Sequence, residues 1–136
     1  MANRKIEEVE GIGPVTGEKL RTAGVKDSDG LLENAKTPAQ RKKLAEATGL
    51  PVEKILKFAN MVDLFRVSGI GAEYAELLEA AGVDTVPELA RRAPASLAAK
   101  LAEVNEAKKL TRRVPTEADV AKWVEQAKGL PRAIEY

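Results

Sequence analysis

The sequence contains no cysteine and no histidine among its 136 residues. Disulfide bonds, thiol chemistry and imidazole chemistry are therefore excluded. The two side chains that most often hold zinc are also missing, so a zinc site is excluded and no cofactor or metal is expected. The acidic residues include no obvious catalytic pair, since Glu7, Glu8 and Glu10 are spaced as on a helix surface. We expect a protein that is not an enzyme.

Aromatic residues make up only 4% of the chain, so the core must be built from leucine, valine, isoleucine and alanine. There is no aromatic platform on which bases could stack, which counts against binding of single-stranded nucleic acid. No apolar run approaches the length of a membrane span, and the first ten residues lack the apolar centre of a signal peptide. We expect a cytoplasmic protein without a membrane partner.

The sequence also lacks an excess of either charge, because it contains 22 lysines and arginines and 21 acidic residues. The net charge of +1 gives no support to nucleic-acid binding, so any such surface must be a local patch. The densest basic cluster is Lys108, Lys109, Arg112 and Arg113. If residues 107–113 are helical, the spacing puts all four on one side. That side is either a solvated face or a contact for an anion. A similar but weaker cluster is Arg41-Lys42-Lys43.

One sequence frame occurs twice. "EGIGPVTGEKLRTAGV" covers residues 10–25, and "SGIGAEYAELLEAAGV" covers residues 68–83, at a constant offset of 58 residues. Such self-similarity is typical of a duplicated structural unit. The repeat predicts two units, 1–66 and 67–136, which together form one compact domain. The second unit carries an insertion near 106–115 that holds "KKLTRRVP".

Apolar residues recur every three or four positions and no strand pattern is present, which predicts an all-α protein of about ten short helices. The first is short and ends at Gly11, and a longer one begins at Pro51 with an apolar face that joins the two units. A capping pair at Thr116 begins the last helix. Further helices are expected at 14–23, 28–35, 38–48, 85–92 and 94–107.

The Gly-Ile-Gly segments predict a specific turn. Glycine permits a tight connection between two helices with positive φ, and the isoleucine can fill the core from inside the turn. The next helix then presents its free N–H groups and its positive dipole end outward. This arrangement is a natural site for a phosphate oxygen.

The residues around both turns carry a resemblance to helix-hairpin-helix motifs. In the first copy the pattern is Val9, Gly11-Ile12-Gly13, Leu20 and Gly24-Val25, and the second copy repeats it 58 residues later. The resemblance implies two helix-hairpin-helix units related by a pseudo-two-fold axis. It also implies binding of duplex nucleic acid without sequence preference, through turn amides and a following lysine or arginine. The whole chain also resembles an uncharacterised family of bacterial proteins built from two such units, which implies no activity.

Carried onto this sequence, the resemblance assigns phosphate contacts to the first copy. The residues assigned to it are Gly11, Ile12, Gly13 and Lys19, with Arg21 and Lys26 nearby. Position 15, often lysine in binding members, is Val15, and its equivalent in the second copy is Glu73. Residues 71–90 contain five acidic residues and no lysine or arginine, so a phosphate there would be repelled.

Two functions stay open at this point. The first is weak, sequence-independent binding of duplex DNA or structured RNA through the first copy and the basic clusters. The second is a protein-interaction or scaffolding module in which the hairpins are purely structural. There the acidic face of residues 73–88 and the basic cluster would meet a protein partner or another copy of the chain.

Overall fold

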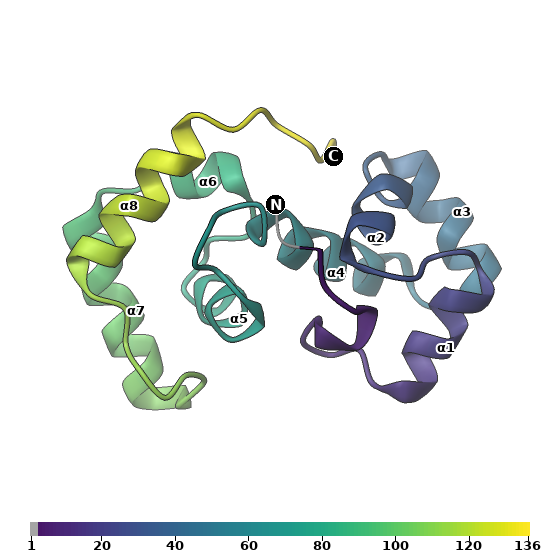
Figure 1. The fold of residues 1–136 in the computed structure, drawn as a ribbon, viewed down its shortest axis with the longest axis horizontal. Coiled ribbons are helices and arrows are strands. Elements are labelled where there is room, and N and C mark those ends of the chain that lie inside the picture. Colours follow the sequence, from purple (N-terminus) through teal and green to yellow (C-terminus); the bar gives the residue numbers. More distant parts are fainter. Residues whose placement is uncertain (1–2) are drawn as a thin grey trace. The chain divides into compact units, whose positions relative to one another are not determined.

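The structure is a computed structural model that describes residues 3–136, and in that part of the chain every helix or strand element is a helix. It contains a 3-10 helix, η1 (Ile6–Glu8), and eight α-helices (Figure 1). The α-helices are α1 (Pro14–Thr22), α2 (Ser28–Asn34), α3 (Pro38–Thr48), α4 (Val52–Leu64), α5 (Ala72–Ala80), α6 (Val86–Ala90), α7 (Pro94–Lys108) and α8 (Glu117–Lys128). The all-α class is confirmed, with nine helical elements in the described residues where the sequence predicted about ten.

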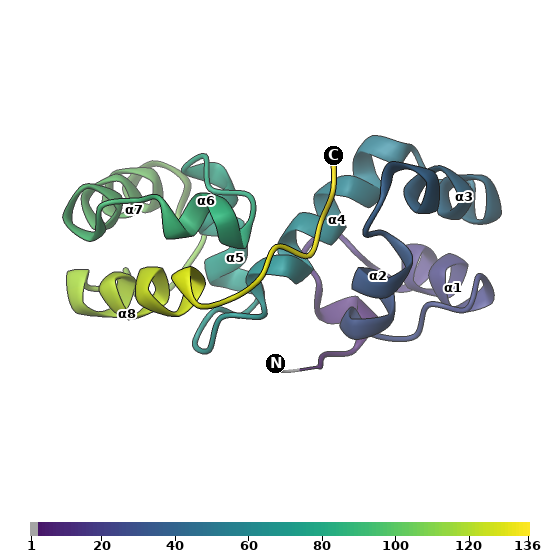
Figure 2. The ribbon, with the colours of Figure 1, turned by 90° about the horizontal axis from the view of Figure 1, so that it is seen from above.

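The chain divides into two compact units. The first unit is the part up to Asp63 together with Arg132–Tyr136, and the second unit is Leu64–Pro131. Residues 132–136, which the sequence placed in the second half, therefore pack with the first unit. Figure 2 shows the chain leaving α8 and ending beside α4.

Local signals set the helix boundaries of the first unit. The Thr37 hydroxyl accepts a hydrogen bond from the backbone N–H of Gln40, and the Gln40 side chain accepts one from the Thr37 N–H. Pro38 occupies the first helical position and Gly49 ends α3 with φ of 76°. Proline at the start and left-handed glycine at the end are the usual limits of an α-helix, and α3 matches the predicted range.

The core of the first unit is largely aliphatic. Ile6 on η1, Leu20 on α1, Leu31 on α2 and Ile55 on α4 are each fully buried. At about 25 cal/mol per Å² of apolar surface, each such side chain stabilises the fold by roughly 1.5–3 kcal/mol relative to an exposed one. Val52, the first residue of α4, is 39% exposed, so the apolar face predicted for this helix is not buried at its start.

In the second unit, α8 packs against α6 and α7, and α7 also contacts α5. Figures 1 and 2 both show α7 and α8 lying side by side. A capping box of Thr116 and Asp119 begins α8 where the sequence predicted. Trp123 on α8 is a core residue. It is 5% exposed, and its ring lies 5.2 Å from that of Tyr74 on α5.

The insertion does not form the helix on which the basic cluster depended. α7 ends at Lys108, and Lys109 has a left-handed backbone with φ of 52°. The Asn105 side chain then exchanges two hydrogen bonds with the backbone of Thr111, at 2.9 and 3.1 Å. Asn105 and Thr111 are both buried, and their pairing holds the segment after Lys109 against the end of α7. The four cations of the cluster therefore lie around a loop, and the helix over 107–113 that would put them on one side does not form.

Candidate functional site: the glycine turns and their basic residues

The two Gly-Ile-Gly segments adopt the same backbone conformation. We call residues 9–13 the first glycine turn and residues 67–71 the second glycine turn. Gly11 and Gly69 have φ of 92° and 93°. In each turn the isoleucine N–H donates to the carbonyl three residues before it, at 3.0 Å in the first and 3.2 Å in the second. Both isoleucine side chains are buried, at 4% and 2% exposure, so each turn is anchored by an isoleucine packed in the core.

The helices that follow the turns also end alike. In α1 the N–H of Val25 donates to the Leu20 carbonyl and that of Gly24 to the Arg21 carbonyl. The same two bonds end α5, at an offset of 58 residues, and both closing glycines are left-handed. This Schellman geometry satisfies carbonyls that the helix leaves unpaired. The duplicated sequence frame therefore encodes a duplicated backbone.

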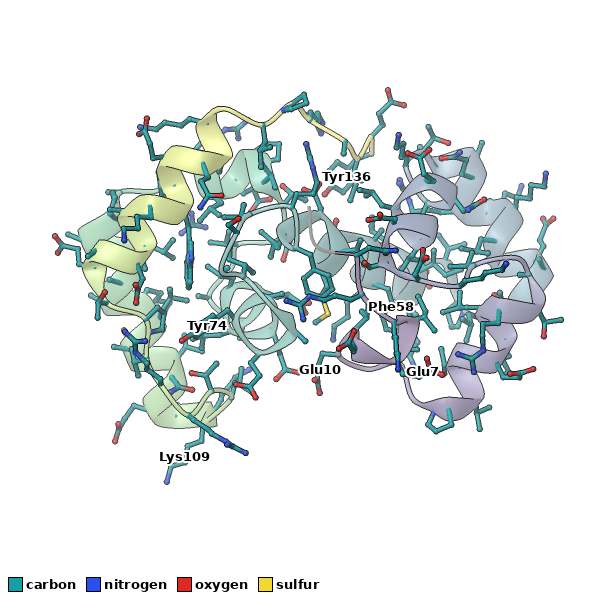
Figure 3. The ribbon with its side chains drawn as sticks, in the orientation of Figure 1. Glu7, Glu10, Phe58, Tyr74, Lys109 and Tyr136 are labelled. Atoms are coloured by element: carbon teal, nitrogen blue, oxygen red, sulfur yellow. The ribbon has the colours of Figure 1, made fainter. Side chains whose placement is uncertain are left out.

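An aromatic ring covers the first glycine of each turn. A Cβ atom at Gly11 would lie 3.2 Å from Cε1 of Phe58, and one at Gly69 would lie 3.1 Å from Nε1 of Trp123. Figure 3 shows Phe58 reaching toward the segment that carries Glu7 and Glu10. Glycine is thus required at both positions for two reasons: the backbone has a positive φ, and an aromatic ring lies too close for a side chain.

The second glycine of the first turn is open to solvent. Gly13 is the N-cap of α1, has an extended backbone and caps the helix with no side chain. A Cβ atom at this position would meet nothing within 4 Å. The space beside Gly13 is therefore free of protein atoms. Pro14 has no N–H, so the amides that the start of α1 could offer an anion are those of Val15 and Thr16, and the helix dipole adds positive potential there.

The basic residues assigned to the first copy differ in their availability. Lys19 on α1 and Lys26 after it are exposed, and neither makes an ion pair within residues 3–136. Arg21 is instead held by Glu7 and Glu18. The hydrogen bond between Arg21 and Glu7 lowers the pKa of Glu7 and raises the pKa of Arg21. Arg21 is thus held by two carboxylates, whereas Lys19 and Lys26 are unpaired, and the turn itself carries one exposed carboxylate, Glu10.

An open groove of about 650 Å³ runs along α1 and the end of α3 in the first unit. Pro14, Val15, Thr22, Ala47 and Thr48 line it, and charged side chains of α1 border it. Val15 is 70% exposed. At the position of Lys19, which lines this groove, the second unit instead has Leu77, which is fully buried. The exposed valine and this groove were not found from the sequence.

The basic loop, residues 108–113, is a separate cationic surface on the second unit. Lys108, Lys109 and Arg112 are exposed and make no ion pair within the described chain. Arg113 lies 3.5 Å from the carboxylate of Asp119. Figure 3 shows Lys109 at the end of the loop, pointing away from the helices. The structure thus brings three unpaired cations together, although not in the predicted helical form.

The weaker cluster at residues 41–43 is not one surface. Arg41 is only 4% exposed and donates hydrogen bonds to three backbone carbonyls, whereas Lys42 and Lys43 are exposed. In the described residues no group of three or more acidic side chains could hold a metal ion. Over the same residues, no helix is both long enough and apolar enough to cross a membrane.

Comparison with protein families gives one match, over residues 10–130, to the family described as "Domain of unknown function (DUF4332)". The chain belongs to this family. The matched region contains both glycine turns and the basic loop, and the family description assigns no activity to any of them. Searches of curated proteins and of solved structures find no match. Function must therefore be argued from the residues themselves.

Proposed function

We propose that this protein is a non-catalytic binding module built from two helix-hairpin-helix units. In this proposal the first glycine turn binds the phosphate backbone of duplex nucleic acid, without sequence preference. The observation that supports it most is the open N-terminus of α1 at Gly13, with the unpaired Lys19 and Lys26 on and after the same helix. The matching backbone of the two turns supports the tandem arrangement.

The physical argument predicts weak binding. A phosphate oxygen would accept hydrogen bonds from the backbone N–H groups at the start of α1, where the helix dipole is positive. Two lysines would release about two condensed counterions, which gives a slope of about −2 in a plot of log K against log salt concentration. Arg21 adds little because two carboxylates already bind it. The basic loop supplies a second phosphate contact, which steepens the slope.

The test is fluorescence anisotropy of a labelled DNA duplex at several salt concentrations. Lys19→Glu with Lys26→Glu should weaken binding by about tenfold or more, because two phosphate contacts become repulsive. The control is Lys42→Glu with Lys43→Glu, which makes the same change of net charge on α3 instead of on and after α1. Equal affinity of the two double variants would place the site outside the first glycine turn. Lys108→Glu with Arg112→Glu then tests the basic loop.

A protein-interaction module is the second candidate, and one observation favours it. Val15 is 70% exposed beside an open groove, at a position where binding members of the resembled family often carry lysine. A photo-crosslinking residue at position 15 separates the two candidates in a cell extract. A nuclease-sensitive product supports nucleic acid at this turn, and a protease-sensitive product supports a protein partner.

A further inference from the structure

The first unit holds residues 132–136 as it would hold a short peptide. The backbone N–H of Glu135 donates to the carbonyl of Lys36 at 2.7 Å. The carbonyl of the same residue accepts a hydrogen bond from Nη2 of Arg41, also at 2.7 Å. Both main-chain groups of one residue are thus bound, which is typical of the recognition of an extended segment.

Two side chains of the segment add specificity. Ile134 is 2% exposed. Two residues further on, the Tyr136 hydroxyl donates to Oδ1 of Asn60 on α4 at 2.9 Å. The guanidinium carbon of Arg41 lies 5.9 Å from the centre of the Tyr136 ring, within cation–π range. The surface therefore selects an apolar residue at position 134 and a tyrosine at position 136, and it binds only the backbone of the residue between them.

Arg41 is the centre of this surface. A buried guanidinium is costly unless its N–H groups find acceptors. Its Nη1 binds the carbonyls of Ala35 and Lys36 at 3.0 and 3.2 Å, and the extended segment supplies the third acceptor. In the second unit the corresponding position, three residues after the first proline of α7, is the apolar Leu97. The buried cation is thus specific to the unit that binds the segment.

We propose that this surface is a peptide-docking site and that it accepts residues 132–136 of a second copy of the chain in place of the chain's own. The segment follows α8 through the non-helical residues 129–131, and a few hydrogen bonds with one buried isoleucine hold it. A second copy offers the identical contacts, so exchange of the segment forms a domain-swapped assembly. This inference goes beyond nucleic-acid binding and does not depend on it.

The first experiment is complementation between two variants of the 136-residue chain. Arg41→Leu copies the residue of the second unit and destroys the site while the segment stays intact. Ile134→Asp destroys the segment while the site stays intact. In analytical ultracentrifugation at high micromolar concentration, each variant alone should be a monomer and their mixture should form a 1:1 heterodimer. A mixture that contains monomers only would overturn the proposal.

A second measurement guards against a variant that does not fold. A labelled peptide with the sequence of residues 130–136, LPRAIEY, should bind the Ile134→Asp chain more tightly than the wild-type chain, whose site is filled. Arg41→Leu, combined with Ile134→Asp, should weaken this binding about tenfold or more, since a charged hydrogen bond is lost. If circular dichroism shows that Arg41→Leu is unfolded, Asn60→Ala replaces it and should also weaken binding. A peptide with aspartate at the isoleucine position is the control, and equal binding of both peptides refutes the site.

These outcomes are separate from those of the DNA experiment. Peptide binding and heterodimer formation depend on α3 and α4, whereas the salt-dependent anisotropy depends on Lys19, Lys26 and the first glycine turn. A protein that fails to bind DNA can therefore still show the docking site. Conversely, loss of the heterodimer leaves the DNA result unaffected.

Discussion

Alanine substitution of three glycines in the first unit separates the folding role of the first glycine turn from its binding role. Gly11 and Gly24 both have φ of 92°, but only Gly11 has a neighbour, Cε1 of Phe58, at 3.2 Å from a Cβ atom. Gly13 has φ of −93° and nothing within 4 Å. An alanine at position 11 therefore meets backbone strain and crowding, one at position 24 meets backbone strain alone, and one at position 13 meets neither.

The magnitudes follow from these geometries. An alanine in the left-handed region costs about 1–2 kcal/mol, and its lower entropy in the unfolded chain returns roughly 0.4–1 kcal/mol. Gly24→Ala should thus destabilise by about 1 kcal/mol. Gly11→Ala must also displace the Phe58 ring, at an added cost of about 1 kcal/mol. For Gly13→Ala the entropic gain and the poorer N-cap roughly cancel, so its stability should stay close to that of the wild type.

Urea denaturation followed by circular dichroism measures these differences, with the midpoint shifting at constant slope. DNA binding gives the complementary result, because a methyl group at position 13 would occupy the space where a phosphate approaches α1. Gly13→Ala should therefore fold normally and bind duplex DNA several-fold more weakly. A neutral Gly11→Ala would refute the assigned strain and crowding. Unchanged DNA binding by Gly13→Ala would refute the phosphate site at this turn.

Further predictions concern the loop, the groove and acid stability. Asn105→Ala should destabilise by about 1–3 kcal/mol and speed tryptic cleavage after Lys108, because it leaves the buried backbone of Thr111 unpaired; cleavage at the wild-type rate would contradict this. Val15→Lys should tighten DNA binding several-fold in the anisotropy assay, and unchanged affinity would count against a phosphate at α1. The hydrogen bond from Arg21 lowers the pKa of Glu7, and backbone N–H groups lower the pKa of Asp27 and Asp119. Since these carboxylates are more acidic in the folded state, their stabilisation is present at neutral pH and is lost as the pH falls from about 5 toward 2. Thermal melts across that range should show a falling midpoint, and a flat profile would contradict the ion pair and caps. Burial, and then the neighbouring Glu88, raise the pKa of Asp84. Asp84→Asn should therefore stabilise the fold at pH 7, and this gain should vanish in acid. Thermal melts of the variant and the wild type at neutral and acid pH would show the difference.

The sequence by itself determined the local structure. The Thr37 cap, Pro38 and Gly49 act within a few residues of one another, so the limits of α3 could be predicted. The same holds for the glycine turns, where positive φ and the repeated spacing are encoded in neighbouring residues. The all-α class follows from these signals, because apolar spacing and capping depend on short-range geometry.

Only the tertiary structure decided which charged groups are available. The helical spacing of the basic cluster could not reveal that Asn105 binds Thr111 and turns the chain at Lys109. Nor could it show that Glu7 neutralises Arg21, since the two are 14 residues apart. Arg41 is the clearest case, because its acceptor on Glu135 lies 94 residues away. Local spacing fixes where a side chain sits on its helix, but its partners come from segments that only folding brings together.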